Sequence, residues 1–158
     1  MEIYDSLLGA VCDEYDRVTL IKKSERGEVT LIRHRASGNR YIFRHFSGSS
    51  EVYRKLLTVS CPNLPQIMEV GEKEGKTALL EEYVQGDTLG EILQGGLLTA
   101  AQAKQITRQL CMALWVLHSL GVVHRDVKPD NVIIRGTEAV LIDFDASRIH
   151  IPQGRNQL

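Results

Sequence analysis

Two short polar segments flank a pair of apolar runs near the end of the sequence. Residues 124–131 precede the apolar run 132–134, and Asp143 follows the apolar run 140–142. Residues 135–138 between the runs are turn formers, so the pattern predicts a small β-hairpin. Such a hairpin carries polar residues at both of its outer ends, and we expect the functional residues of the chain to lie there.

These polar segments contain the groups that phosphoryl transfer requires. The reaction needs an acceptor for the proton of the attacking hydroxyl, oxygen ligands for Mg²⁺, and positive charge against the transferred phosphate. Asp126 is a candidate acceptor, and Lys128 supplies positive charge. Asn131 and Asp143 supply oxygen ligands. Six residue types fixed in this register would arise by chance at about 10⁻⁸ per starting position, so coincidence does not explain them.

The rest of the sequence predicts a small sheet and a long helix. Apolar residues at helical spacing predict an amphipathic helix within residues 1–17. Thr99 and Gln102 form a capping box for a longer helix that ends at Gly121. Turn residues around Gly86 predict a break after residue 84. Strands are expected at residues 18–21, 29–34, 41–46, 66–70 and 77–83, with one helix over residues 49–59, capped by Ser49 or Ser50.

The segment His-Arg-Asp-Val-Lys-Pro-Asp-Asn at 124–131, followed by Asp143-Phe144-Asp145, resembles the protein kinase family. The catalytic loop of that family is HRDxxxxN, and its Asp-Phe-Gly follows on the next hairpin. A lysine two residues after the aspartate of this motif, as Lys128 is after Asp126, is the form similar to serine/threonine rather than tyrosine kinases. The stretch that begins with Asp143 looks like those of bacterial serine/threonine kinases, with aspartate in place of glycine at Asp145. The resemblance covers residues 18–151, and we expect a truncated or minimal form of the family.

This resemblance implies an α+β, protein kinase-like fold. Residues 1–17 are expected to form an N-terminal helical extension. Residues 18–84 are expected to form the N-lobe, which is a small antiparallel five-stranded sheet with one helix. Residues 85–158 are expected to form a truncated, mainly helical C-lobe with the hinge, the long helix, the catalytic loop and the metal-binding hairpin.

The resemblance also implies an ATP site. The segment 22–29 matches the family's glycine-rich loop but keeps only Gly27 and Val29 of its motif. The backbone of Glu82 and Val84 would bind the base. Glu81 would occupy a position that is usually apolar, where a buried carboxylate needs a partner. The implied site residues are Asp126, Lys128 and Asn131 for catalysis, Asn131 and Asp143 for Mg²⁺, and Gly27, Val29, Ile42, Arg44, Glu51, Glu82, Val84 and Ile133 for ATP.

Arg44 stands where the family has a lysine that grips the phosphates. Arginine keeps the charge but is a wider, planar donor, so the exchange is not conservative. Glu51 is the candidate partner of Arg44. A carboxylate at the start of a helix, with no catalytic role, accounts equally well for Glu51.

Composition limits the partners of the chain. Nineteen basic and twenty acidic residues are interspersed and give a net charge of −1, which offers no electrostatic basis for binding nucleic acid or acidic membranes. The sequence begins without the pattern of a signal peptide and has no apolar run of membrane-spanning length. Cys12, Cys61 and Cys111 are far apart and odd in number, so we expect a reducing, cytoplasmic location.

Three functions follow from the sequence. The first is a serine/threonine protein kinase that depends on ATP and Mg²⁺, and the second is a nucleotide-binding pseudokinase that serves as a scaffold. The third is a small-molecule phosphotransferase of kinase-like fold, which Lys128 and Pro129 disfavour because they follow the protein kinase form. A truncated lobe exposes apolar surface on the long helix, so a homodimer or a covering partner is expected. The sequence does not identify the protein substrate.

Overall fold

The computed structural model describes residues 2–150 of the chain. The chain divides between Gln85 and Gly86 into two compact units. This division lies next to the break that the turn residues predict after residue 84.

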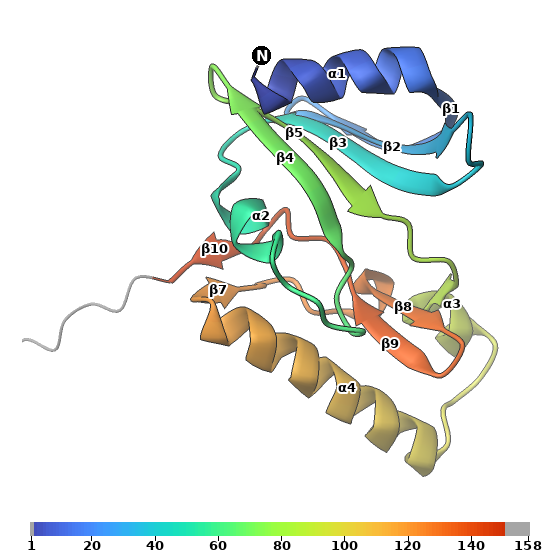
Figure 1. Cartoon of the computed structure of the whole chain (residues 1–158). Coiled ribbons are helices and arrows are strands. Elements are labelled where there is room, and N and C mark those ends of the chain that lie inside the picture. Colours follow the sequence, from blue (N-terminus) through green and yellow to red (C-terminus); the bar gives the residue numbers. More distant parts are fainter. Residues whose placement is uncertain (1, 151–158) are drawn as a thin grey trace, which may run out of the picture. The chain divides into compact units, whose positions relative to one another are not determined.

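The first unit is built on a five-stranded antiparallel sheet, as the resemblance predicted. The strands lie in the order β1-β2-β3-β5-β4 (Figure 1). Most of β1 is exposed, so hydrophobic alternation marks only part of it and the sequence pattern underestimates its length. The bounds are β1 Tyr15–Ser24, β2 Gly27–His34, β3 Arg40–Ser47, β4 Ile67–Lys73 and β5 Lys76–Glu82.

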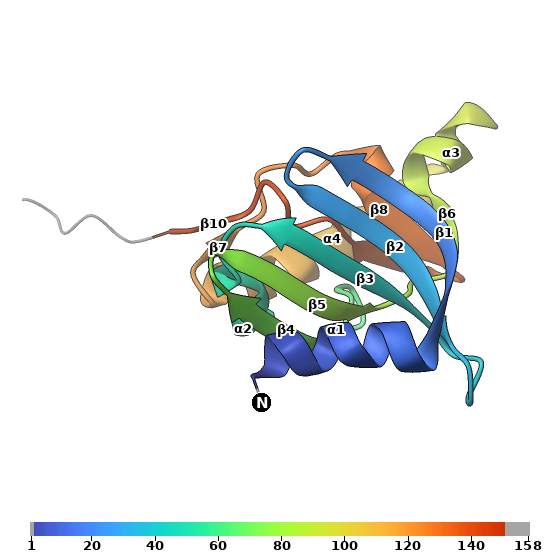
Figure 2. The same cartoon turned by 90° about the horizontal axis from the view of Figure 1, so that it is seen from above.

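Helix α1, Ile3–Glu14, packs on one face of this sheet (Figures 1 and 2). Tyr4, Leu7 and Val11 of the helix join a core with Ile32 and Phe43 of the sheet. Leu80 and Ala78 of β5 complete that core. A helix that supplies three core side chains is part of the unit, and β1 already begins at Tyr15. The helix ends before residue 17, where the sequence analysis set the end of the helical extension, because Tyr15 and the two residues after it belong to β1.

Helix α2, Glu51–Leu56, is shorter than the sequence predicts. Glu72 of β4 accepts hydrogen bonds from the backbone N–H of Ser50 (2.9 Å) and from its hydroxyl. The Ser50 side chain is thus not available as a cap, and the Ser49 hydroxyl accepts the N–H of Glu51 instead (3.1 Å). The buried side chains of Tyr53 and Leu56 anchor the helix, which begins where these contacts fix the chain.

The second unit contains a long helix and two small ladders. Helix α4, Ala100–Ser119, has the predicted capping box, in which Thr99 and Gln102 exchange two hydrogen bonds (3.0 and 3.1 Å). It contacts the edge strands β7, Val122–Val123, and β9, Glu138–Leu141. The other elements are β6 Asp87–Thr88, α3 Leu89–Gln94, the 3₁₀ turn Pro129–Asn131, β8 Val132–Arg135 and β10 Arg148–Ile149.

The predicted hairpin is formed by β8 and β9, and β6 adds to it in the order β6-β8-β9. Gln109 of α4 fixes its turn, because the side-chain amide donates to the Thr137 carbonyl (3.0 Å) and accepts the Ala139 N–H. The sequence patterns did not predict α3, β6, β7 or β10. Two-residue strands and a six-residue helix are too short for a periodic signal.

Much of α4 faces away from the core, and only Ala113 and Leu117 of the helix are buried. Trp115 and Met112 are 68% and 52% exposed. Within residues 2–150, none of the helices combines the length and apolar character that crossing a membrane requires.

Candidate functional site

The β8–β9 hairpin brings the two polar segments of the second unit together. Val132 pairs with Leu141, so Asn131 precedes one strand where Ile142 follows the other. The Ile142 N–H donates a hydrogen bond to the Asn131 carbonyl oxygen (2.9 Å). Asp143 is therefore one residue away from a direct backbone contact with Asn131. This is the proximity that the hairpin pattern predicted.

Asn131 also contacts Asp126 directly. Its side-chain amide nitrogen donates to the Asp126 carboxylate oxygen Oδ2 (3.0 Å) and to the Asp126 carbonyl oxygen (2.9 Å). Both bonds use the amide hydrogens of a buried side chain, so the amide group is oriented with its oxygen as the remaining acceptor. Lys128 Nζ lies 3.5 Å from the same carboxylate oxygen of Asp126. The three predicted catalytic side chains thus form one cluster.

His124 ties the two polar segments to each other. It is only 1% exposed, and its Nδ1 accepts the backbone N–H of Asp126 (3.2 Å). The ring proton must then be on Nε2, which donates to the Ile142 carbonyl oxygen (2.9 Å). The ring also meets Phe144 edge to face at 5.6 Å. Sequence reasoning gave His124 no role of its own, although its place two residues before Asp126 was visible.

Two residues of the site adopt a backbone conformation that side chains rarely occupy. Arg125 and Asp143 have φ angles of +71° and +65°. Aspartate tolerates this region better than arginine does, and the Asp143 carboxylate accepts the N–H of Asp145 (3.1 Å). In the described chain the remaining non-glycine residue of this kind is Glu74, in the tight β4–β5 turn. Such conformations persist where surrounding contacts enforce them, and they are frequent at functional sites.

The donor set of the second unit fits a magnesium ion. Mg²⁺ keeps several waters and takes one or two carboxylates together with phosphate oxygens. Asp143 offers a carboxylate, and the hydrogen bonds of Asn131 leave its amide oxygen as a second ligand. Among residues 2–150 no three His, Cys, Asp or Glu side chains gather into a metal site.

The first unit contains a buried ion pair between Arg44 and Glu81. Arg44 Nε lies 2.6 Å from Glu81 Oε2, and the two side chains are 9% and 3% exposed. Because Ile42 pairs with Glu81 and Arg44 pairs with Leu79, Arg44 and Glu81 are diagonal neighbours on one face of the sheet. Long side chains reach each other at this spacing. The partner that a buried carboxylate at Glu81 requires is therefore Arg44.

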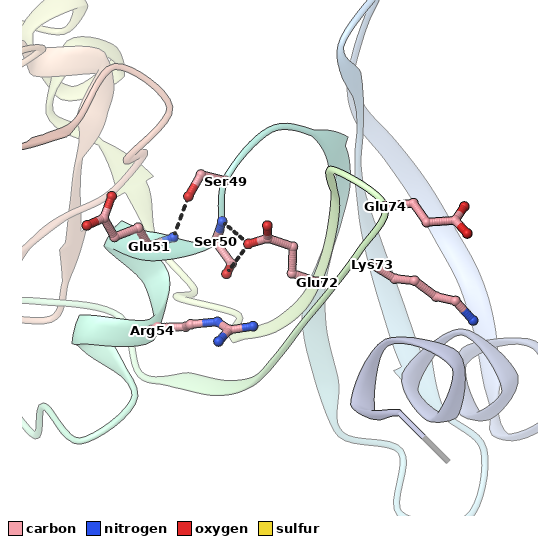
Figure 3. Close-up of a pocket in the computed structure, with 7 residues that line it drawn as sticks. All are labelled: Ser49, Ser50, Glu51, Arg54, Glu72, Lys73 and Glu74. Carbon is pink, nitrogen blue, oxygen red and sulfur yellow. Dashed lines mark hydrogen bonds between the residues drawn. The ribbon is translucent and has the colours of Figure 1, made fainter.

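Glu51 does not take that place. It is exposed at the first residue of α2 and lines an open pocket of about 420 Å³ together with Arg54 and Glu72 (Figure 3). The structure places the Glu81 carboxylate, not that of Glu51, against Arg44, so the expected Arg44–Glu51 pair is wrong for this structure. The physical reason is the contact of Ser50 with Glu72, which fixes the start of α2. The alternative, a carboxylate at the start of a helix, fits the position of Glu51.

The other residues implied for ATP lie in both units. Val29 pairs with Arg44, and Leu31 pairs with Ile42, so Val29 and Ile42 share the face that carries Arg44. Val84 follows β5 and is buried. Ile133 belongs to β8 in the second unit.

Gly27 and Glu82 have structural contacts of their own. A Cβ atom on Gly27 would lie within 2.5 Å of Phe46 Cα, so the close approach of β3 requires glycine there whether or not a phosphate binds. Glu82 ends β5, and its N–H donates to the Gln66 carbonyl (2.8 Å). Its carboxylate accepts the Gln66 N–H (2.9 Å).

Comparison with known proteins connects this site to one family. A family model described as "Protein kinase domain" matches residues 17–157. The serine/threonine-protein kinase pkn2 of Myxococcus xanthus is 33% identical over 109 residues, which are 66% of this chain and 13% of that protein. The testis-specific serine/threonine-protein kinase 3 of Mus musculus is 31% identical over 140 residues, which are 87% of this chain and 51% of that protein.

Solved structures include the same fold. The crystal structure of Rad53 1–466 in complex with AMP-PNP matches with a TM-score of 0.72 and 22% identity. The match covers 85% of this chain and 39% of that one. The chain spans 13% and 51% of the two relatives described above. Helix α1 lies outside the residues that the family model matches.

Proposed function

Because the chain belongs to the protein kinase family, we propose that it transfers the γ-phosphoryl group of ATP to a serine or threonine hydroxyl of a protein. The observation that carries this proposal is the cluster of Asp126, Lys128 and Asn131, which the β8–β9 hairpin holds beside Asp143. These are the groups that phosphoryl transfer uses.

Asp126 is proposed to orient the attacking hydroxyl and to accept its proton. The hydroxyl oxygen forms a bond to the γ-phosphorus while the bond from that phosphorus to the bridging oxygen breaks, and ADP leaves with the electron pair. Lys128 lies beside Asp126 and supplies positive charge against the transferred group. The hydrogen bond from Asn131 fixes the Asp126 carboxylate, so the acceptor is oriented before substrate binds.

Asn131 and Asp143 are the residues that would hold Mg²⁺. When bound, the ion would neutralise charge on the phosphate oxygens. The protein's part is to orient two oxygen donors, through the Asn131 amide bonds and through the His124 bridge between Asp126 and Ile142.

The first unit is proposed to supply groups for the nucleotide. Val29 and Ile42 would contact the base with the same face of the sheet that carries Arg44, and Ile133 of the second unit would add apolar contact. Gly27 would lie near the phosphates. Glu82 would contribute its carbonyl oxygen, because its N–H already donates to Gln66, and Val84 would contribute its backbone.

We further propose that a second copy of the chain or another protein covers α4, because Trp115 and Met112 of this helix are exposed. Trp115 is the single tryptophan of the chain, so a blue shift of its emission with rising protein concentration would report a homodimer. We also propose a cytoplasmic location, which the three free cysteines support.

Transfer of labelled phosphate from γ-labelled ATP to generic protein substrates tests the proposed activity. We expect Asp126→Asn to lower the rate about 10²-fold or more, because proton acceptors contribute on that scale. Asp130→Asn is the matched control, since Asp130 is an exposed carboxylate of the same loop, and it should stay close to wild type. If wild type and Asp126→Asn bound ATP equally and neither transferred phosphate, the result would contradict the proposed kinase activity and favour a nucleotide-binding scaffold.

A further inference from the structure

Two residues of the first unit depart from the family's pattern, and they contact each other. Arg44 stands where a lysine is expected, and Glu81 stands where an apolar residue is expected. Their side chains form the buried ion pair at 2.6 Å. A single physical cause can therefore account for both departures, because each buried charge is neutralised by the opposite charge of the other side chain.

A buried guanidinium requires a negative partner. Arginine stays protonated in proteins, and an unpaired charge at 9% exposure would be strongly disfavoured. Glu81 meets that requirement from β5, the strand that pairs with β3, where it lies diagonally across from Arg44. The register is fixed by seven paired positions from Tyr41 to Ser47. The pair is thus held by the sheet itself rather than by a movable helix.

Glu51, which the family resemblance offers as the partner of Arg44, does not supply the carboxylate in this structure. Glu51 is exposed and lines the pocket with Arg54 and Glu72 (Figure 3). The start of α2 is fixed there by the two hydrogen bonds from Ser50 to Glu72.

We propose that Glu81 is the positioning residue for Arg44 and that it takes the role which a helix glutamate would otherwise have. This inference rests on the proposed function, in which Arg44 binds the phosphates of ATP. Glu81 contacts Nε, which is one of several nitrogens of a guanidinium with five N–H donors. The contact at Nε fixes the plane of the guanidinium, and a fixed plane is what bidentate phosphate recognition by arginine requires.

Calorimetric titration of wild type and variants with ATP plus Mg²⁺, and separately with adenosine, tests the inference. Glu81→Gln should weaken ATP binding about tenfold, because charged hydrogen bonds have that effect, while adenosine binding stays nearly unchanged. Glu51→Gln is the matched control and should change neither affinity. A purely structural role for Glu81 would not alter the ratio of the two affinities.

A double variant covers the case in which Glu81→Gln fails to fold. Arg44→Met with Glu81→Leu replaces the whole ion pair by apolar side chains, which folded proteins often tolerate. It should bind ATP as weakly as Arg44→Met alone, because Glu81 acts only through Arg44. A further loss in the double variant would show an independent role for Glu81 and would overturn the inference.

The results also separate this inference from the proposed function. Equal losses of ATP and adenosine affinity in Glu81→Gln, or a loss in Glu51→Gln alone, would overturn the role of Glu81 while nucleotide binding stands. Wild-type protein that binds neither ligand would overturn both.

Discussion

Replacement of His124 by phenylalanine tests the bridge that holds the catalytic loop. The variant keeps a ring that can pack on Phe144 but removes both ring hydrogen bonds. The Asp126 N–H and the Ile142 carbonyl then lose their partners. A buried group left unsatisfied costs about 1–3 kcal/mol, and the partly exposed Asp126 segment can recover some of this from water. We therefore expect a loss of about 3 kcal/mol in the free energy of unfolding, a large fraction of a typical domain's stability.

Urea unfolding followed by tryptophan fluorescence measures this loss in the unit concerned. Trp115 is the single tryptophan and lies on α4 in the same unit. With a slope of about 1–3 kcal/mol per molar urea, the midpoint should fall by about 1–3 M. His118→Phe, which changes an exposed histidine of α4, is the control and should shift the free energy by no more than about 0.5 kcal/mol.

Loss of the His124 bridge should also affect nucleotide binding. The variant should also bind ATP with Mg²⁺ more weakly, because the backbone that carries Asp126 and Ile142 is no longer tied. Equal midpoints for His124→Phe and His118→Phe would refute the argument, since the buried bridge would then contribute no more than an exposed side chain.

Two further predictions concern the packing of α1. Leu7→Ala should lower the free energy of unfolding by about 3 kcal/mol, because Leu7 is 3% exposed in the core. Ile3 is 54% exposed on the same helix, so Ile3→Ala should have little effect. Similar losses for the two variants, in urea unfolding followed by circular dichroism, would contradict the packing of α1. Burial, and then the charge of Lys76, lower the pKa of His45 below its usual 6.5, so the stability that neutral His45 contributes is present above pH 6.5 and is lost as the pH falls through the lowered value. Unfolding midpoints measured across this range should fall less steeply in His45→Gln than in wild type, and an unchanged slope would count against the burial of His45 as the cause of its lowered pKa.

Local patterns predicted the elements that carry the site. The hairpin of β8 and β9 was visible because two apolar runs flank a turn, and its register then places Asn131 beside Ile142. The capping box of Thr99 and Gln102 identified the start of α4 in the same way. In both cases the signal lies within a few residues of the structure that it specifies.

Contacts between distant residues were not predictable in this way. The pairing of Arg44 with Glu81 depends on the register of β3 and β5, and a shift of one residue would turn Glu81 to the other face. The packing of Leu7 against Phe43 likewise depends on which face of the sheet α1 covers. These contacts follow from tertiary geometry, which the family resemblance that suggested Glu51 as the partner of Arg44 does not specify.

The magnesium dependence of ATP binding tests the central claim most directly. Calorimetric titration should show that wild type binds ATP more tightly with Mg²⁺ than with EDTA, and that Asp143→Asn loses most of this difference while Asp130→Asn keeps it. A full magnesium effect in Asp143→Asn, or none in wild type, would contradict the assignment of Asn131 and Asp143 as ligands of the ion.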